Sequence, residues 1–142
     1  MNDRTSTAAA RFALSTASSE LALSVVVPMF NEEGGAAALV EEISVALKAV
    51  PHEIIVVDDC STDGTLTALA TARAKAPQLR ILAHGTNAGQ SRAIRTGILA
   101  ARSSVIATLD GDGQNDPADV PRLLKALTRA AAPEDLAMAA GE

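Results

Sequence analysis

Glu53-Ile-Ile-Val-Val-Asp58 is a continuous β-branched run that ends in a carboxylate, and it decides the fold class. A run without polar alternation is typical of a strand that is buried on both faces of a parallel sheet. Leu23-Ser-Val-Val-Val-Pro28 has the same character, and Val105-Ile-Ala-Thr-Leu109 is a further strand. Leu79-Arg-Ile-Leu-Ala83 is weaker, so we expect it nearer a sheet edge. Together these segments predict about four parallel strands.

Helical patterns follow each of these strands. Asn31 is expected to cap the first helix, the second is expected to begin within residues 61–63, the third at about Gly89, and the fourth at Pro117 or Ala118. Each helix is expected to turn one apolar stripe inward. The stripe residues are Leu39, Ile43, Leu47 and Val50, then Leu66, Leu69 and Ala70, then Ile94, Ile98 and Ala101, and finally Val120, Leu123, Leu124 and Leu127. Strands alternating with helices predict right-handed βαβ crossovers, and therefore an α/β fold with helices on both faces of the sheet.

Composition limits the possible functions. The 142 residues carry a net charge of −5, from 12 basic and 17 acidic side chains, and include two Phe but neither Trp nor Tyr. Acidity without a basic stripe argues against a nucleic-acid partner, and the single cysteine, Cys60, excludes an internal disulfide. No apolar run approaches the roughly 20 residues that cross a bilayer. We expect residues 1–20 to be flexible, residues 21–132 to form the domain, and residues 133–142 to fray.

Polar residues collect where the predicted strands end. Ligands of open parallel sheets bind beyond the carboxyl ends of the strands, near the switch in strand order. Acidic clusters follow two of the buried strands, at residues 58–63 and 110–116. Like charges placed together destabilise a fold, and a divalent cation or a ligand donor would relieve that repulsion. These clusters are the central functional signal.

Asp110-Gly-Asp112-Gly-Gln114 can bring three oxygen groups to one side of the chain. Such hard ligands suit Mg²⁺ or Mn²⁺, with a substrate diphosphate completing the coordination shell. The same pattern is equally typical of an Asp/Gly/Asn turn that caps the next helix. Both interpretations stay open at this point.

Asp58-Asp59 could accept hydrogen bonds from a nucleobase imide or from ribose hydroxyls. The alternative is that Asp59 or Ser61 only bonds the loop backbone while Asp58 is solvated. His84 lies near the same edge, as a bystander candidate.

Asn87-x-Gly89-xxx-Ala93-xxx-Gly97 places small residues one turn apart, which permits close packing of a helix on the sheet. The N-terminus of that helix could also favour a phosphate, with Arg92 or Arg95 reaching it. For Arg95, a plain surface charge is the preferred interpretation.

Four blocks, taken in order, carry a family resemblance. They are VVVPMFNEE (25–33), IIVVDDCSTDGT (54–65), NAGQSRAIRTGILAA (87–101) and TLDGDGQNDPADVPRLL (108–124). They resemble family 2 glycosyltransferases of the Rossmann-like GT-A fold. Within that family they look most like the polyprenyl-phosphate sugar transferases, meaning dolichyl-phosphate mannosyltransferase-like enzymes and their bacterial relatives.

The resemblance implies a nucleotide-diphosphosugar donor of UDP or GDP type and a Mg²⁺ or Mn²⁺ cofactor. The resemblance implies that Asp58 contacts the nucleobase. The residues that it implies in nucleotide binding are Pro28, Phe30, Asn31, Glu32, Asp58, Asp59, Asn87, Gly89 and Asp110. The implied metal ligands are Asp110, Asp112 and Gln114. Relatives often carry His before the proline pair where this chain has Asn115-Asp116-Pro117, a departure that bears on contacts around the ligands and not on the metal itself.

The implied reaction is an inverting displacement at the anomeric carbon. A polyprenyl-phosphate acceptor at the membrane surface would need no strong base, whereas a saccharide hydroxyl would need a carboxylate, and we find no candidate for that base. The chain ends about thirty residues after Asp112, so we expect it to hold the donor half and to lack the acceptor half. The expected location is the cytoplasm, including the cytoplasmic face of the inner membrane.

Two alternatives are kept. One is a non-catalytic nucleotide-sugar or metal-binding module that works with a partner chain. The other is a phosphoacceptor receiver domain, suggested by the acidic pair Asp58-Asp59 and by Asp110 after a later strand. A receiver needs the pair after its first strand and a lysine after a fifth strand, and the sequence offers neither.

Overall fold

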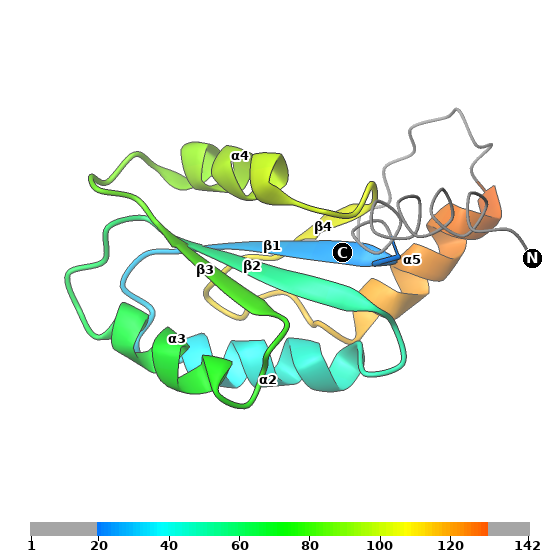
Figure 1. Cartoon of the computed structure of the whole chain (residues 1–142), viewed down its shortest axis with the longest axis horizontal. Coiled ribbons are helices and arrows are strands. Elements are labelled where there is room, and N and C mark those ends of the chain that lie inside the picture. Colours follow the sequence, from blue (N-terminus) through cyan, green and yellow to red (C-terminus); the bar gives the residue numbers. More distant parts are fainter. Residues whose placement is uncertain (1–19, 131–142) are drawn as a thin grey trace, which may run out of the picture.

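A computed structural model of the chain describes residues 20–130, and its centre is a parallel four-stranded sheet (Figure 1). The strands are β1 (Leu23–Met29), β2 (His52–Asp58), β3 (Leu79–Ala83) and β4 (Ile106–Thr108), in the spatial order β3-β2-β1-β4. All four predicted strands are confirmed, and β3 lies at an edge of the sheet as expected. The predicted flexible segment 1–20, apart from Glu20, and the predicted frayed segment 133–142 lie outside the described residues.

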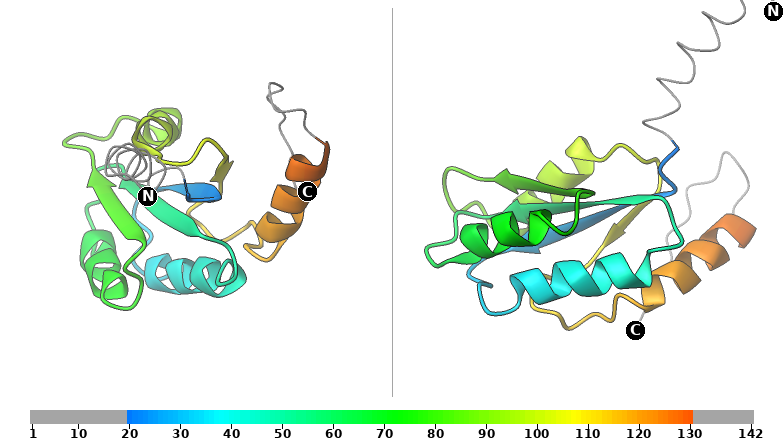
Figure 2. Two further views of the ribbon diagram at one scale, coloured as in Figure 1. Left: turned by 45° about the vertical axis from the view of Figure 1, so that its right-hand side comes forward. Right: turned by 60° about the horizontal axis from the view of Figure 1, so that its bottom comes forward.

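The helices lie on both faces of the sheet, as predicted (Figures 1 and 2). α2 (Ala36–Ala46) and α3 (Thr65–Arg73) pack against each other on one face, and α4 (Gln90–Ala100) covers the other face, against β1 and β2. α5 (Asp119–Ala130) follows on the β4 side of the sheet (Figure 2). The parallel strands place every strand's carboxyl end at the same edge.

Alternate residues of the central strands enter two separate cores. Val25, Val27, Ile54 and Val56 face α2 and α3, whereas Val26, Ile55 and Val57 face α4. This division explains the continuous apolar runs, since both faces of β1 and β2 are covered. The predicted inward stripe at the first helix is confirmed for Leu39, Ile43 and Leu47, which are all buried, whereas Val50 lies after the end of α2 and is half-buried.

Two of the other predicted stripes are partly wrong. In α3, Leu69 is buried as predicted, but Leu66 is 40% exposed and Thr65 is buried in its place. In α4, Ile98 is 42% exposed, and the buried residues are Ala93 and Gly97. The small residues face the sheet because α4 lies very close to it. A Cβ added at Gly97 would stand 2.3 Å from Val26 Cγ1.

The amino ends of the strands are joined by a buried polar network around Glu53, which is 3% exposed. Its carboxylate accepts hydrogen bonds from Ser24 Oγ (2.6 Å), Arg80 Nη1 (2.8 Å) and the backbone N–H of Arg102 (2.7 Å). The backbone N–H of Ser103 donates to Ser24 Oγ over 3.0 Å. The network therefore fixes the connection from α4 to β4, and with it the start of the strand that leads to Asp110.

Candidate functional site

A cleft of about 240 Å³ opens at the carboxyl ends of the strands. The residues that line it are Pro28, Met29, Phe30, Glu32, Asp59, Gln90, Ala93, Asp110, Gly111 and Asp112. We call it the acidic cleft, because four carboxylates line it and, within the part of the chain that the structure describes, neither lysine nor arginine does. The carboxylates come from the ends of β1, β2 and β4, which are distant in sequence and adjacent in the sheet.

The segment after β1 is joined to the loop before α3. Asn31, in the left-handed region with φ 54°, accepts a hydrogen bond from Thr62 N on its Oδ1 (2.8 Å) and donates its own N–H to Ser61 Oγ (2.9 Å). The N–H of Glu32 donates to Thr65 Oγ1 (2.8 Å). The prediction that Asn31 caps the first helix is wrong. That helix, α2, begins only at Ala36, and Gly35 is its N-cap residue. The Asn31 side chain spans two loops instead.

Asp58 does not line the acidic cleft. Its side chain is fully buried and accepts hydrogen bonds from Ser61 Oγ (2.5 Å) and Ser61 N (3.1 Å). The alternative that Asp58 is solvated is therefore wrong. Because Ser61 Oγ also accepts the N–H of Asn31, Asp58 is connected to the cleft wall through one hydroxyl.

Asp59 lines the acidic cleft and also holds the loop that leads into α4. Asp59 is 3% exposed. Its carboxylate accepts hydrogen bonds from Ala88 N, Gly89 N and His84 Nδ1, and each of these bonds is 2.8 Å long. Burial by itself would raise the pKa of Asp59, but these hydrogen bonds hold that pKa below its ordinary value of 3.8. Asp59 therefore bonds loop backbone, as the alternative expected, but it also bonds the His84 side chain and keeps an ionised carboxylate at the cleft, so it does not only bond the backbone.

The loop after β4 presses on the end of β1. A Cβ added at Gly111 would stand 2.3 Å from the carbonyl oxygen of Pro28, so no larger residue fits there without movement. Asp110 accepts a hydrogen bond from Gln90 Nε2 (3.2 Å), and Asp112 accepts one from the N–H of Gln114 (3.0 Å). This segment is a hydrogen-bonded turn, and it presents two of the three predicted oxygen groups, those of Asp110 and Asp112, to the acidic cleft. The metal interpretation stays a prediction.

The three predicted metal ligands are divided between the acidic cleft and the protein surface. Asp110 and Asp112 line the acidic cleft, whereas Gln114 is exposed and does not. No group of three or more His, Cys, Asp or Glu side chains able to hold a metal occurs within residues 20–130. Mg²⁺ is often bound through one or two carboxylates, with waters and substrate phosphates supplying its other ligands. The two carboxylates therefore fit a cation that is shared with a diphosphate.

Five of the nine residues predicted to bind the nucleotide line the acidic cleft: Pro28, Phe30, Glu32, Asp59 and Asp110. The other four, Asn31, Asp58, Asn87 and Gly89, do not line it. Asn31, Asn87 and Gly89 instead form hydrogen bonds to neighbouring loops. For example, Asn87 Nδ2 donates to the carbonyl oxygen of Asp59 (3.2 Å).

The sequence analysis missed two polar residues of this region. Gln90 lines the acidic cleft but was not predicted to do so. It is the first residue of α4, and a polar side chain at the start of a helix expected at this edge of the sheet could have indicated it. His84, taken as a bystander, is hydrogen-bonded on both ring nitrogens, by Nδ1 to Asp59 and by Nε2 to Thr96 Oγ1 (2.8 Å).

The family model described as "Glycosyl transferase family 2" matches residues 24–132. The chain belongs to glycosyltransferase family 2. The receiver-domain interpretation is therefore wrong. The acidic pair follows β2, which lies between β3 and β1, whereas a receiver carries the pair after its first strand.

Curated relatives of this family 2 chain include polyprenyl-phosphate sugar transferases. Dodecaprenyl-phosphate galacturonate synthase of Rhizobium johnstonii is 46% identical over 112 residues, which are 77% of this chain and 33% of that protein. Undecaprenyl-phosphate 4-deoxy-4-formamido-L-arabinose transferase of Yersinia enterocolitica is 41% identical over 106 residues, or 72% of this chain and 32% of that protein. The matched part of the chain thus spans about a third of the length of these relatives.

Solved structures of GT-A glycosyltransferases share the fold of this family 2 chain. S. aureus TarS 1–349 in complex with UDP-GlcNAc superimposes with a TM-score of 0.56 at 32% identity, covering 63% of this chain and 26% of TarS. The mannosyltransferase PcManGT of Pyrobaculum calidifontis, in complex with GDP-Man and Mn²⁺, gives 0.61 at 28% identity, covering 78% of this chain and 32% of that one. Within residues 20–130, none of the helices has the length and apolar character needed to cross a membrane.

Proposed function

We propose that the acidic cleft binds the nucleotide-diphosphosugar donor of a sugar transferase together with Mg²⁺ or Mn²⁺. The observation that carries the proposal is the charge of the cleft: among residues 20–130, four carboxylates line it and no basic side chain does. A diphosphate is itself anionic, so it would be repelled from such a cleft unless a cation lay between them. Structural neighbours named with UDP-GlcNAc and with GDP-Man and Mn²⁺ support the same ligand classes.

In this proposal some residues contact the nucleotide directly, and others hold the contacting residues in position. Pro28, Phe30 and Glu32 at the end of β1 form the wall for the nucleoside, with Asp59 on the β2 side. Asp58 acts through Ser61, whose hydroxyl holds the N–H of Asn31 in place. Asn87 and Gly89 belong to the loop that bonds Asp59. We keep all of them as residues that nucleotide binding depends on, by contact or by support.

Asp110 and Asp112 are the proposed cation ligands, with Gln114 as the third if the turn rearranges to bring its amide in. When bound there, a divalent cation would neutralise the charge that develops on the leaving diphosphate. The turn itself is held by Asn115 Oδ1, which accepts the N–H of Asp110 over 2.8 Å, and by the contact of Gly111 with Pro28. This support fixes the two carboxylates relative to the wall that would hold the nucleoside.

The proposed reaction is an inverting transfer to a polyprenyl phosphate, the lipid class in the names of the curated relatives. A phosphate oxygen attacks the anomeric carbon as the bond from that carbon to the diphosphate oxygen breaks, and the nucleoside diphosphate leaves. No strong general base is needed, because the attacking phosphate is already ionised at neutral pH. The site of action would be the cytoplasmic face of the membrane that holds the lipid.

Calorimetric titration with UDP and GDP, with and without Mn²⁺, tests the donor and metal assignments. We expect Mn²⁺-dependent binding by the chain, at least tenfold weaker in Asp112→Ala. Asp119→Ala, at the start of α5 and outside the acidic cleft, is the matched control and should bind as the unmodified chain does. Binding that ignores Mn²⁺, or that Asp112→Ala leaves unchanged, would contradict the metal assignment.

Incubation of the chain with the donor and a polyprenyl phosphate tests for sugar transfer by these 142 residues. Transfer with inversion supports the transferase and contradicts the non-catalytic module. Nucleotide binding without transfer fits both the donor half of a transferase and the module.

A further inference from the structure

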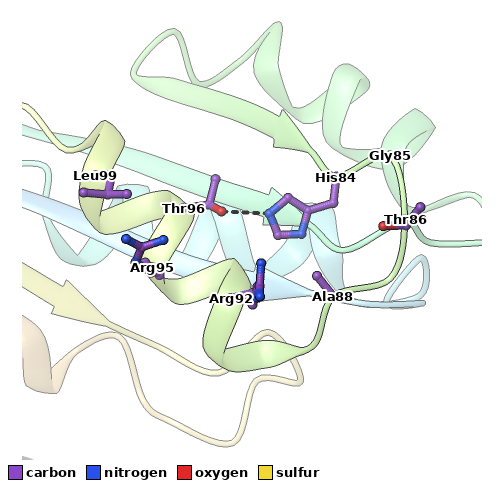
Figure 3. Close-up of a pocket in the computed structure, with 8 residues that line it drawn as sticks. All are labelled: His84, Gly85, Thr86, Ala88, Arg92, Arg95, Thr96 and Leu99. Atoms are coloured by element: carbon purple, nitrogen blue, oxygen red, sulfur yellow. Dashed lines mark hydrogen bonds between the residues drawn. The ribbon is translucent and has the colours of Figure 1, made fainter.

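A second cleft, also of about 240 Å³, lies between the loop after β3 and α4. The side chains that line it are those of His84, Thr86, Arg92, Arg95, Thr96 and Leu99 (Figure 3). We call it the arginine cleft. Gln90 and Ala93 of α4 line the acidic cleft instead, so none of residues 20–130 lines both clefts. Arg92 and Arg95, considered from sequence as phosphate ligands at the start of α4, belong to this second cleft.

The two arginines have no ionic partner in the described part of the chain. The ion pairs found within residues 20–130 are Arg80–Glu53, His84–Asp59 and Arg122–Asp119. No Asp or Glu of the described residues lines the arginine cleft, and α4 itself contains no acidic residue. Two guanidinium groups one helical turn apart thus form a local positive site on a chain whose net charge is −5.

The donors that remain free in the arginine cleft suit a phosphate. His84 is engaged on both ring nitrogens, by Asp59 and by Thr96, so it forms a wall and does not contribute a free donor. Arg92 and Arg95 keep their guanidinium N–H groups, whose planar fork matches phosphate oxygens.

Large apolar side chains are exposed beside these donors. Leu99, which lines the arginine cleft, is 71% exposed, and its neighbour Ile98 is 42% exposed. They are among the few exposed large apolar side chains in the described residues, and both lie on α4. A soluble phosphate would leave them in water, whereas a phospholipid brings acyl chains next to its phosphate. Helices that lie at a membrane interface combine large apolar side chains that enter the acyl boundary with Lys or Arg side chains on their polar side, which attract anionic lipids.

We propose that the outer face of α4 docks on an anionic membrane, with the phosphate of a phospholipid headgroup in the arginine cleft and Leu99 in the acyl boundary. The small residues Ala93 and Gly97 face the sheet, so α4 stays packed while its outer face meets the lipid. The net negative charge of the chain opposes such binding, which is why a local cationic face is required. The proposal does not depend on the donor site, because it uses none of the residues of the acidic cleft.

Co-sedimentation with vesicles tests it. We expect the chain to bind phosphatidylcholine vesicles that contain phosphatidylglycerol and not vesicles of phosphatidylcholine alone. The double variant Arg92→Gln/Arg95→Gln should lose about thirtyfold in partition coefficient, since each basic residue near an anionic surface contributes about fivefold to tenfold. Leu99→Ser should lose about tenfold, from the apolar area withdrawn from the bilayer.

Controls keep each outcome decisive. Arg73→Gln, on the exposed side of α3 across the sheet, removes the same charge and should retain nearly all vesicle binding. Equal losses in Arg73→Gln and in the single variant Arg92→Gln would overturn the proposal, as would equal binding to uncharged vesicles. Thermal stabilisation by inorganic pyrophosphate that depends on the two arginines, without vesicle binding, would make this a site for soluble phosphate and also overturn it. Mn²⁺-dependent UDP or GDP binding, measured in the same variants, reports separately on the donor site.

Discussion

Gly97 of α4 and Val26 of β1 touch so closely that a Cβ atom at Gly97 would stand 2.3 Å from Val26 Cγ1 and 3.2 Å from Cγ2. Val26 is fully buried in a central strand, so it has little room to move away. This contact sets the distance between α4 and the sheet. The position of α4 in turn sets where Gln90 and Ala93 meet the acidic cleft.

Gly97→Ala should destabilise the fold by about 1–3 kcal/mol, the usual cost of overpacking a core. The effect runs against helix propensity, which favours alanine over glycine by about 1 kcal/mol. Urea unfolding measures it, with Gly85→Ala as the control, because a Cβ at Gly85 meets nothing within 4 Å. Combining Gly97→Ala with Val26→Ala should cost less than the sum of the two single changes. Strict additivity would contradict the contact.

Gly111→Ala should weaken Mn²⁺-dependent nucleotide binding at least tenfold. The added Cβ would stand 2.3 Å from the Pro28 carbonyl oxygen and 2.8 Å from Met29 Cγ, so the loop that carries Asp110 and Asp112 must shift. Calorimetry of Gly111→Ala beside Gly34→Ala, whose Cβ meets nothing within 4 Å, isolates that shift. Unchanged affinity in Gly111→Ala would show that the carboxylates do not depend on this contact.

Asp59→Asn should loosen the loop that leads into α4. An amide offers one acceptor oxygen where the carboxylate accepts the N–H groups of Ala88 and Gly89 on two. Hydrogen exchange at those two amides, followed by NMR, should speed up at least tenfold, while Asp119→Asn in α5 leaves them as they are. Protection that survives Asp59→Asn would mean that the loop is held by other contacts.

Stability should fall on acidification through Glu53 and Asp59. Burial alone would raise the pKa of Glu53, yet hydrogen bonds from Ser24, Arg102 and Arg80, with the charge of Arg80, hold that pKa below its ordinary value of 4.5. The pKa of Asp59 is likewise held below 3.8. In this acid range the unfolded chain binds more protons than the folded chain, so the free energy of unfolding rises with pH. The stabilisation is fully present above about pH 5 and is lost as the pH falls through the folded pKa values.

Urea unfolding between pH 3 and pH 7 measures that dependence. Glu53→Gln should lower the free energy of unfolding at pH 7 by about 2 kcal/mol, since it weakens hydrogen bonds to a buried charge. It should also flatten the slope below pH 4.5. Glu41→Gln, on the exposed face of α2, should do neither. A Glu53→Gln variant with an unaltered acid slope would exclude Glu53 as a source of the pH dependence.

The strands and the edge that holds the site were predictable because their causes are local. A run such as Ile54–Val57 can be buried only on both faces, and parallel strands then bring Asp59 and Asp110 to one edge. For α4, apolar size predicted the wrong inward residue, Ile98, whereas the one-turn spacing of the small residues Ala93 and Gly97 correctly predicted close packing on the sheet. Close approach to Val26 selects the small residues and leaves Ile98 outside.

The roles of the two neighbouring carboxylates also lay beyond sequence reasoning. Asp58 and Asp59 are adjacent, yet Asp58 points into the loop of Ser61 and Asp59 toward the backbone before α4. The donor to Asp58 is only 3 residues away, whereas the Gly89 donor to Asp59 is 30 residues away and reaches it only when the sheet has formed. The partnership of His84 with Asp59 and Thr96 is hidden for the same reason.

Phe30 gives this fold an optical handle. It is 45% exposed at the acidic cleft, in a chain that contains neither Trp nor Tyr. An indole introduced by Phe30→Trp would be the single strong fluorophore of the molecule, so its emission would come from the cleft alone. Occupancy of the site could then be followed in real time by quenching or a wavelength shift, without background from the rest of the protein.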